Sequence, residues 1–376
     1  MRVEQQQWSV GTGWTGNDMR CADADLVLAF GATCHIQNAS IWNDLRTKWP
    51  KARIVGCSTA GEIAGTVVLD DSVVATALRF ERSHASAVSV RLCDVDGSHA
   101  AGVALASQLA NAGLCHVFVL SDGLHVNGSD LVDGMAAALP PGVAVTGGLS
   151  GDGSRFQQTV VGLDEVPDVD RVIAIGLYGS ALRLGYGSQG GWDPFGPERL
   201  VTRARGAVLY ELDGQPALEL YKRYLGEYAA ELPASGLLFP LTVRRGDERG
   251  VVRTILAINE ADQSLTFAGE VKEGAYGRLM RANFDRLVDG ASGAARTCAN
   301  GLDGRTPDVA FLISCVGRKL VLRQRVEEEV EAVREVLGPR PVLTGFYSYG
   351  EISPFNRSAR CELHNQTMTV TTLLEE

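Results

Sequence analysis

Three continuous apolar runs stand out along this chain, and each predicts a strand that is buried on both faces. The runs lie at residues 26–30, 117–120 and 309–313. A stretch long enough for a helix follows each run, and a second short strand then follows at 53–55, 143–145 and 341–343. Two strands joined by a helical crossover are parallel neighbours in one sheet. The pattern therefore predicts the same strand–helix–strand unit three times.

A glycine-rich segment follows the second strand of each unit, and we call these segments the first, second and third glycine loops. They read Gly-Cys-Ser-Thr-Ala-Gly-Glu-Ile at 56–63, Gly-Gly-Leu-Ser-Gly-Asp-Gly at 147–153 and Gly-Phe-Tyr-Ser-Tyr-Gly-Glu-Ile at 345–352. Ligands of parallel sheets bind beyond the carboxyl ends of the strands, where these loops begin. We therefore expect the three loops to meet, with Glu62, Asp152 and Glu351 at equivalent places. Tight turns alone would also explain the glycines.

The predicted ligand site consists of the small, hydroxyl, acidic and aromatic residues of these loops. Its members are Cys57, Ser58, Thr59, Gly61, Glu62, Gly147, Gly148, Ser150, Asp152, Tyr347, Ser348, Tyr349 and Glu351. Glycine lets a ligand approach backbone amides, which serve as donors. A tyrosine offers a flat apolar face with a polar tip to a planar ligand, although core packing would explain the same tyrosines.

The third unit carries the clearest helix. Its apolar stripe consists of Leu322, Val326, Val330, Val333 and Leu337. The spacing is typical of one buried helix face, and Gly338-Pro339 predicts its end. Farther upstream, 279–288 predicts a helix that stops at Asp289-Gly290, and the small residues of 290–307 predict a loop.

The middle of the chain, from about 170 to 270, has short strands with short connections, which predicts antiparallel hairpins. The polar segment 164–168 contains a proline and predicts a boundary there, with one module at 1–168 and another at 169–376. The expected fold class is α/β (mixed α+β). It consists of two modules with layered mixed sheets, built from the repeated units plus these hairpins.

Composition narrows the class of protein. The 376 residues carry a formal net charge of -10, which argues against nucleic acid as a partner because a phosphate backbone needs a basic face. The apolar runs are far shorter than the ~20 residues of a membrane helix, and the first residues lack the apolar core of a signal peptide. Eight scattered cysteines without Cys-x-x-Cys indicate neither a zinc site nor a disulfide framework. We expect a cytoplasmic protein that does not bind membranes.

The glycine loops resemble segments of the FIST family, whose name is short for F-box and intracellular signal transduction. So do Tyr-Glu-Leu-Asp-Gly-Gln-Pro-Ala-Leu-Glu-Leu-Tyr at 210–221 and Leu-His-Asn-Gln-Thr-Met at 363–368. The first two loops resemble the N-terminal FIST module, and the other segments resemble the C-terminal one. The resemblance implies a cytoplasmic sensory protein that binds a small-molecule or gas ligand. Its output partner would be a histidine kinase or a cyclic-dinucleotide enzyme, and a homodimer is possible.

Stand-alone bacterial members of this family include haem proteins that sense nitric oxide, so the resemblance implies haem b as cofactor and nitric oxide sensing as the function, with regulation of the output partner. Haem iron needs a strong axial donor, and no Cys-x-x-Cys-His is present for covalent attachment. His364 is the first candidate ligand and His125 the second, with Cys57 as a third donor. An ordinary structural histidine remains the alternative for each.

Two other functions stay open. One is a sensor of an amino acid or another small metabolite without haem. The other is an enzyme with Cys57 or Ser58 as nucleophile, which would need a base within hydrogen-bond reach. Gly148 and Phe346 replace the cysteine in the other two loops, so a nucleophile is not part of the repeated pattern. We therefore expect a sensor rather than an enzyme.

Overall fold

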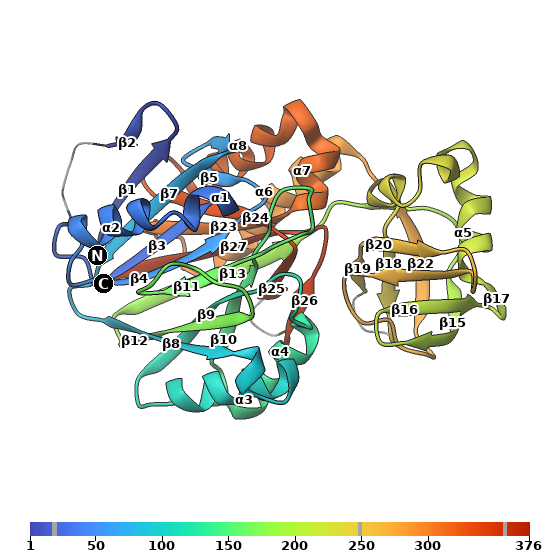
Figure 1. Ribbon diagram of the computed structural model, residues 1–376, viewed down its shortest axis with the longest axis horizontal. Helices are drawn as coiled ribbons and strands as arrows, with labels where there is room; N and C mark the ends of the chain where they lie inside the picture. Colours follow the sequence, from blue (N-terminus) through green and yellow to red (C-terminus); the bar gives the residue numbers. More distant parts are fainter. Residues whose placement is uncertain (17–20, 247–249, 356–358) are drawn as a thin grey trace.

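Two lobes of unequal size make up the protein, as the computed structural model shows (Figure 1). The structure describes residues 1–16, 21–246, 250–355 and 359–376. The larger lobe, which we call the body, is formed by residues 1–192 and 282–376. The smaller lobe, the small domain, is formed by residues 193–281 and is inserted between two elements of the body.

Three six-stranded mixed sheets form the body, and each contains one of the predicted units. The first sheet has the order β11 (Val161–Leu163), β4 (Arg53–Ser58), β3 (Leu26–Gly31), β7 (Ser72–Arg79), β1 (Arg2–Ser9), β2 (Gly13–Thr15). The second has the order β26 (Cys361–His364), β25 (Gly350–Pro354), β10 (Ala144–Leu149), β9 (Leu114–Ser121), β12 (Arg171–Tyr178), β8 (His84–Arg91). The third has the order β13 (Leu182–Gln189), β27 (Met368–Glu375), β23 (Val309–Cys315), β24 (Val342–Ser348), β5 (Glu62–Ala64), β6 (Val67–Leu69).

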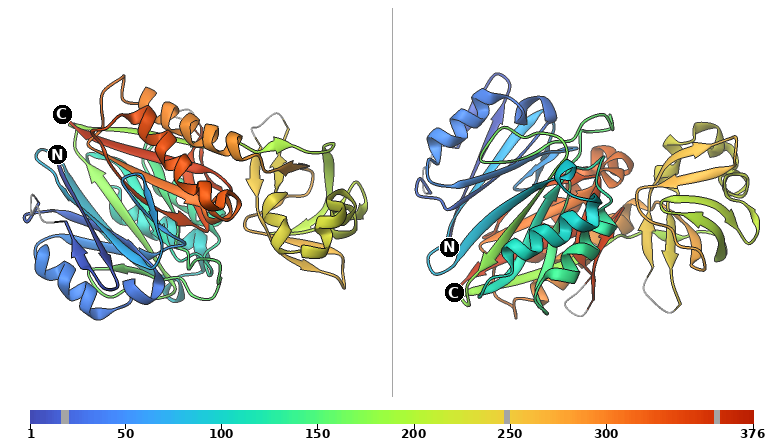
Figure 2. Two further views of the ribbon diagram at one scale, coloured as in Figure 1. Left: turned by 90° about the horizontal axis from the view of Figure 1, so that it is seen from above. Right: turned by 60° about the horizontal axis from the view of Figure 1, so that its bottom comes forward.

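The two strands of each unit are parallel neighbours, as predicted, and an antiparallel third strand lies beside the first. Helices cover the outer face of each sheet (Figure 2). The body helices are α1 (Thr33–Ile36), α2 (Ala39–Lys48), α3 (Gly97–Leu109), α4 (Gly128–Ala138), α6 (Phe284–Asn300), α7 (Val316–Leu322) and α8 (Val326–Leu337), with 3-10 turns at Leu92–Asp94 and Arg323–Arg325. In the described part of the chain, none of the helices combines the length and apolar character that crossing a bilayer requires.

The inner faces of the three sheets enclose one common apolar core. Along β3, Leu28 and Phe30 point into this core, whereas Ala29 packs against the helices outside. This alternation follows from the two-residue period of a strand, and it lets a fully apolar strand serve two cores at once. Across the common core, the rings of Phe118 and Phe311 lie 5.2 Å apart and join the second sheet to the third.

Each unit contributes its next strand to the sheet of another unit. β5 follows the first glycine loop and pairs with β24 of the third unit. β25 follows the third loop and pairs with β10 of the second unit, and β11 follows the second loop and pairs with β4 of the first. The exchange is cyclic and interlocks all three units.

The predicted mixed α/β class with repeated units is confirmed. The expected boundary at 168/169 lies between β11 and β12, inside this interlocked body.

The strands at 171–178 and 182–189 are a correction to the predicted hairpins. They follow each other closely, yet β12 pairs with β8 and β9 whereas β13 pairs with β27, so the chain turns a corner between two sheets. The remaining predicted hairpins lie in the small domain.

The segment predicted as a helix at 279–288 and a loop at 290–307 is a second correction, because α6 begins at Phe284 and runs through this segment to Asn300. A Cβ on Gly290 would lie 2.0 Å from the carbonyl oxygen of Gly190, and one on Gly293 would lie 2.2 Å from the side chain of Gln189. These glycines therefore permit close packing of α6 on the end of β13 and the residue after it. In the sequence, small residues that serve such packing look the same as small residues that form a loop.

The predicted helix of the third unit ends at Gly338 as expected, but it is interrupted. α7 stops at Leu322 and α8 starts at Val326, because Arg323 between them has a positive φ of 52°.

The small domain is an antiparallel sheet around its own apolar core. Its strands are β14 (Asp193–Pro194), β15 (Arg199–Arg205), β16 (Val208–Leu212), β17 (Gln215–Pro216), β18 (Leu241–Arg244), β19 (Val251–Arg253), β20 (Ile255–Asn259), β21 (Ser264–Phe267) and β22 (Tyr276–Arg281), and its helix is α5 (Ala217–Leu225), with 3-10 turns at Gly226–Glu231 and Ala234–Leu238. The hairpins predicted in the middle of the chain are thus confirmed here.

Two glycines fix where the glycine loops begin. Gly147 and Gly345 lie opposite Val119 and Leu312 on the first strands of their units, with φ of 148° and 152°. A Cβ at these places would lie 1.9 Å and 1.8 Å from the carbonyl oxygens of Val119 and Leu312. No other residue fits without moving the strand pair.

We predict that Gly345→Ala destabilises the protein more than Gly304→Ala does. Gly304 also has a positive φ, of 76°, but no atom lies within 4 Å of its would-be Cβ. Gly304→Ala is therefore the control, and it should lower the free energy of unfolding only by the conformational cost of roughly 1–2 kcal/mol. At Gly345, the clash of the new Cβ adds roughly 1–3 kcal/mol to this cost. Urea unfolding of both variants measures the difference. Equal destabilisation would contradict the close approach.

Candidate functional site

The three glycine loops meet in a cyclic ring of backbone hydrogen bonds, which confirms the expectation that they lie together. The bonds run from Ala60 N to Tyr347 O (2.8 Å), from Tyr349 N to Leu149 O (3.2 Å) and from Gly151 N to Ser58 O (3.0 Å). Each loop donates to another in turn, so the amides at these three positions are used within the protein.

Glu62 is buried at the end of the first loop, with 1% of its surface exposed. It lies opposite Phe346, and its carboxylate accepts hydrogen bonds from Thr59 Oγ1 and from Ser72 Oγ (2.6 Å). Burial disfavours the charged form and raises the pKa of Glu62 to about 7. The side chain thus ties its loop to the start of β7.

Glu351 repeats this arrangement in the third unit. It lies opposite Gly148, and its carboxylate accepts hydrogen bonds from Ser348 Oγ (2.6 Å) and from the amide and hydroxyl of Thr367 (3.2 and 3.0 Å). Burial raises its pKa to about 8. Both glutamates therefore tie a loop to the start of the antiparallel strand that lies beside the first strand of its unit, β7 or β27.

Asp152 is not the equivalent of these glutamates, which corrects the expectation from the sequence. By strand register, the equivalent residue of the second unit is Val161, opposite Cys57, because the second loop is longer. Asp152 instead accepts hydrogen bonds from the amides of residues 156–158 (2.8, 2.9 and 3.0 Å) and from the hydroxyl of Tyr349. Burial opposes its ionisation, but these hydrogen bonds outweigh burial and lower its pKa.

The longer second loop presents an exposed aromatic side chain. Phe156 has a positive φ of 52° and is 42% exposed, and its ring stacks on that of Tyr349 at 4.4 Å. A bulky residue in this conformation is strained and persists only where its surroundings hold it. The carboxylate of Asp152 supplies that hold. We call Phe156 and Tyr349 the aromatic platform.

The platform forms one wall of a cleft of about 320 Å³ between the body and the small domain, which we call the aromatic cleft. The body contributes residues 123–128, Leu149 and the platform, and the small domain contributes Ala207, Leu256 and residues 267–270. Leu256 is 43% exposed. Exposed apolar groups thus line both sides of one cleft, which is typical of a ligand site.

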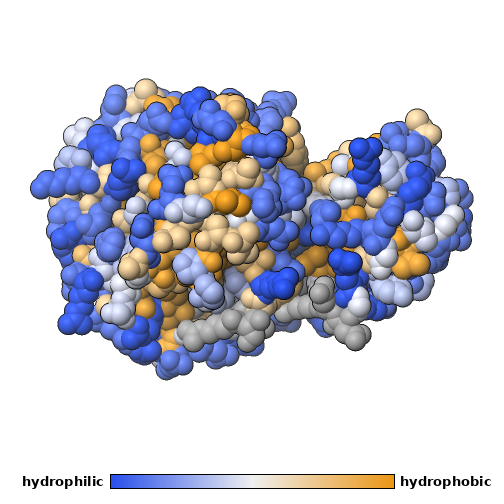
Figure 3. Space-filling view, turned by 90° about the horizontal axis from the view of Figure 1, so that it is seen from below, coloured by the Kyte–Doolittle hydropathy of each residue, from blue (hydrophilic) through white to orange (hydrophobic). Residues whose placement is uncertain are grey.

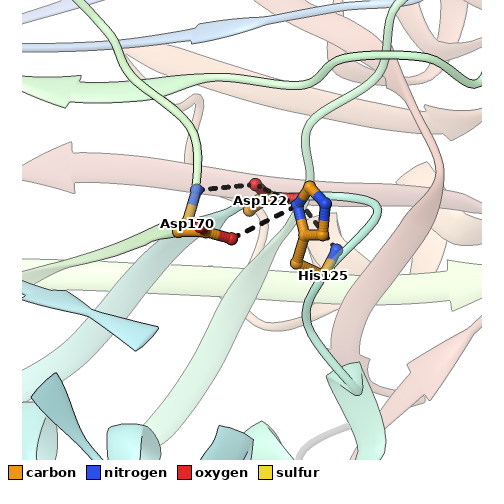
Figure 4. A group of neighbouring side chains, drawn as sticks. All are labelled: Asp122, His125 and Asp170. Carbon is orange, nitrogen blue, oxygen red and sulfur yellow. Dashed lines mark hydrogen bonds and ion pairs between the residues drawn. The ribbon is translucent and has the colours of Figure 1, made fainter. Parts of the chain in front are cut away.

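His125 lines this cleft together with the polar residues Asn127 and Glu270, and Figure 4 shows His125 beside Asp122 and Asp170. Its Nδ1 lies 3.0 Å from Asp122 Oδ2 and 3.4 Å from Asp170 Oδ1, and its side chain is 52% exposed. The hydrogen bond to Asp122 raises the pKa of His125. The sequence analysis missed Asp122 and Asp170, although Ser-Asp-Gly directly after a buried strand was a usable signal.

Asp122 is fully buried and its two oxygens are already engaged. They accept hydrogen bonds from the amides of Leu124, His125 and Asp170 and from the hydroxyl of Thr159, at 2.8–3.0 Å. The three side chains have the types and spacing of a metal cluster, with ligand atoms within 4.8 Å of one another. Because Asp122 would have to give up these bonds, we interpret it as the residue that orients His125.

Apart from His125, every residue predicted for the site is buried. Of the predicted loop residues, Tyr349 alone lines the aromatic cleft, and Asp152 contributes by holding the platform. Cys57 and Ser58 lie inside the body, and burial raises the pKa of the Cys57 thiol well above its usual range. His364 is buried too, and its Nε2 lies 2.6 Å from the carbonyl oxygen of Ser353.

We predict that Glu351→Gln flattens the pH dependence of stability. The folded state raises the pKa of Glu351 from 4.5 to about 8, so its stabilising effect is complete below about pH 4.5 and is lost as the pH rises through 8. The wild type should therefore lose on the order of a few kcal/mol between pH 5.5 and 8.5 that the variant keeps.

Asp152→Asn is the control, because the Asp152 carboxyl should change stability with pH in the opposite direction. The folded state lowers the pKa of Asp152, so its contribution to folding stability is present above the usual aspartate pKa and disappears on acidification. Urea unfolding at several pH values measures both variants. Parallel pH curves for wild type and Glu351→Gln would contradict the buried neutral carboxyl.

The chain is similar to known proteins over most of its length. The family model of the FIST N domain matches residues 25–215, and that of the FIST C domain matches residues 217–354. The uncharacterized protein MJ1623 of Methanocaldococcus jannaschii is 24% identical over 317 residues, which cover 77% of this chain and 59% of that protein. The uncharacterized protein Mb0898c of Mycobacterium bovis is 27% identical over 249 residues, covering 63% and 62%. The chain thus matches about three fifths of the length of these relatives.

Among solved structures, cyanuric acid hydrolase from A. caulinodans covers 78% of this chain at 10% identity, with a TM-score of 0.19 that supports no argument. The two domain models, by contrast, follow each other directly and together span most of the sequence. The chain therefore belongs to the FIST family, whose domains bind ligands and act as sensors in signal transduction.

Proposed function

We propose that this protein senses a small organic ligand in the aromatic cleft and passes the signal on through a movement of the small domain. The observation that carries the proposal is Phe156, a strained and exposed ring that faces a cleft. Native proteins retain such strain where a site requires it. Leu256 on the opposite wall would cover the ligand from the side of the small domain.

The walls define the chemistry of the ligand. The platform, Leu149 and Leu256 suit a flat apolar group. His125 supplies a hydrogen-bonding imidazole, and its hydrogen bond to Asp122 raises its pKa, which favours the protonated form more than in a free histidine. A ligand with an aromatic or aliphatic part and one acidic or acceptor group fits both features. This favours an amino acid or a related metabolite.

The signal needs two arrangements of the lobes that differ in ligand affinity. The small domain joins the body by two chain crossings, and the ligand would touch both lobes. Domain interfaces of this kind permit relative motion. In our proposal the output partner is a histidine kinase or a cyclic-dinucleotide enzyme that contacts one of the two arrangements.

We propose that any haem would be held at His125 rather than at His364. His364 has no space for a planar group, because it is buried and its Nε2 lies against Ser353. His125 has the arrangement of a histidine ligand, since Nδ1 is held by a carboxylate and the ring lines a cleft. In a haem version of the proposal, His125 would hold haem b, whose iron supplies the binding position for nitric oxide.

We propose no catalytic role for Cys57 or Ser58. A nucleophile must reach its substrate and needs a base beside it. Both side chains have no exposed surface, and Ser58 Oγ accepts a hydrogen bond from the amide of Val160. Burial also disfavours the reactive thiolate.

We predict that Phe156→Ala weakens binding of the neutral fluorescent probe N-phenyl-1-naphthylamine by about tenfold or more. Loss of a stacked ring and its buried area is worth roughly 1.5–3 kcal/mol. Phe284→Ala is the matched control, because Phe284 is similarly exposed but lies on α6, away from the cleft. Fluorescence titration of wild type, Phe156→Ala and Phe284→Ala measures the affinity of each for the probe. The same affinity in wild type and Phe156→Ala would reject the aromatic cleft.

A haem titration separates the two versions of the sensor. We predict that any shift of the Soret band on adding haem is lost in His125→Ala and kept in His364→Ala, because His125 lines the aromatic cleft whereas His364 is buried. Absorbance spectra of the ferrous proteins give the result. If wild type shows no Soret shift, the haem version fails and the organic-ligand sensor remains.

A further inference from the structure

A second cleft, of about 510 Å³, lies between the body and the small domain, and we call it the charged cleft. Its cationic residues are Arg244, Arg245, Arg253, Lys272 and Arg360, and its acidic residues are Asp133, Glu270 and Glu362. Among the described residues that line it, five cations against three acids leave a positive site in a protein whose formal net charge is -10. Figure 3 shows strongly hydrophilic side chains at the junction of the lobes on this side.

Arg253 is the exceptional residue of this cleft. It ends β19 of the small domain, is only 6% exposed, and donates hydrogen bonds to the carbonyl oxygens of Leu363 (2.9 Å) and Glu270 (3.2 Å). Among the described residues, it forms no ion pair with a carboxylate. Burial lowers its pKa to about 10, so it stays charged at neutral pH. Buried charges are normally paired directly, whereas the nearby carboxylates of Glu362 and Glu270 act on this cation without forming an ion pair with it.

Some of the other cations of this cleft form ion pairs within the protein, and others do not. Arg244 binds both carboxylate oxygens of Glu198 at 2.7 Å, and Lys272 lies 2.9 Å from Glu270. Arg245 and Arg360 are exposed, and in the described ranges neither has a salt-bridge partner. Together with Arg253, they provide three cationic side chains that form no direct ion pair with a carboxylate in the described part of the protein.

We propose that the charged cleft binds a small molecule with at least two anionic groups, phosphoryl or carboxylate, one of which pairs with Arg253. A guanidinium presents several donors in one plane and suits the oxygens of either group. This site is distinct from the aromatic cleft and shares only Glu270 with it. Because Arg253 also holds the carbonyl oxygen of Leu363 in the body, the anion would fasten the two lobes together.

Isothermal titration calorimetry with two probes, pyrophosphate and citrate, tests the proposal at constant ionic strength set with chloride. We expect at least one probe to bind. The affinities of pyrophosphate and citrate, compared with each other, show whether the site prefers phosphoryl or carboxylate oxygens. Arg253→Gln should weaken binding by about tenfold or more, because a charge-assisted pair is lost. Arg205→Gln is the control, since Arg205 is an exposed arginine of β15 in the same domain.

Binding of neither probe, or equal binding by wild type and Arg253→Gln, would overturn the proposal. If Arg253→Gln does not fold, the double variant Arg245→Gln/Arg360→Gln replaces it, because both side chains are exposed. This variant should keep the thermal unfolding of wild type and still bind the probe several-fold more weakly. An unchanged affinity there would equally reject the site. Failure here leaves the aromatic cleft untouched, because its neutral probe does not sense these charges.

Discussion

The cyclic exchange of strands among the three units is the constraint on which the rest of the body depends. β5, β25 and β11 each complete the sheet of a unit other than their own, and three backbone hydrogen bonds close the ring at the glycine loops. Without any one unit, a neighbour would have an unpaired sheet edge. Buried carboxylates stabilise the same region, where the three glycine loops meet. Glu62 and Glu351 reach the start of the third strand of their units, and Asp122 reaches the amide of Asp170 just before β12.

The candidate site lies where the second unit departs from the repeat. Its loop is longer than the other two, and Asp152 uses the extra length to hold Phe156 in a conformation that a bulky residue rarely adopts. In the same unit the buried acid comes from the loop after the first strand, and this places His125 in the aromatic cleft. The repeated parts thus provide a rigid frame, and the irregular parts provide the exposed groups.

A buried polar network links the ring of loops to the body segments that lead to and from the small domain. The hydroxyl of Tyr347 donates to Glu329 (2.6 Å), and Glu329 pairs with Arg318 (2.7 Å), with both charges fully buried. Arg318 also donates to the carbonyl oxygens of Gly190, shortly before the chain enters the small domain, and of Leu287, shortly after the chain returns to the body. Breaking such a network costs several kcal/mol, because it leaves a buried charge unpaired. These segments are therefore anchored to the loops, and the small domain has a fixed base from which to move.

The sequence by itself determined the repeated strand–helix–strand units, the strands β3, β9 and β23, the end of α8 at Gly338 and the meeting of the glycine loops. These features depend on local periodicity and on conformations that only glycine adopts. Tertiary structure alone decided three other matters. It decided that Gly290 and Gly293 lie inside a helix, because their small size serves packing against a distant segment. It also decided that Val161, not Asp152, is the equivalent of the glutamates, because strand register depends on partners far away in the chain. Finally, it decided which side chains face a cleft, because a site between two lobes depends on where the small domain docks, and no local pattern records that.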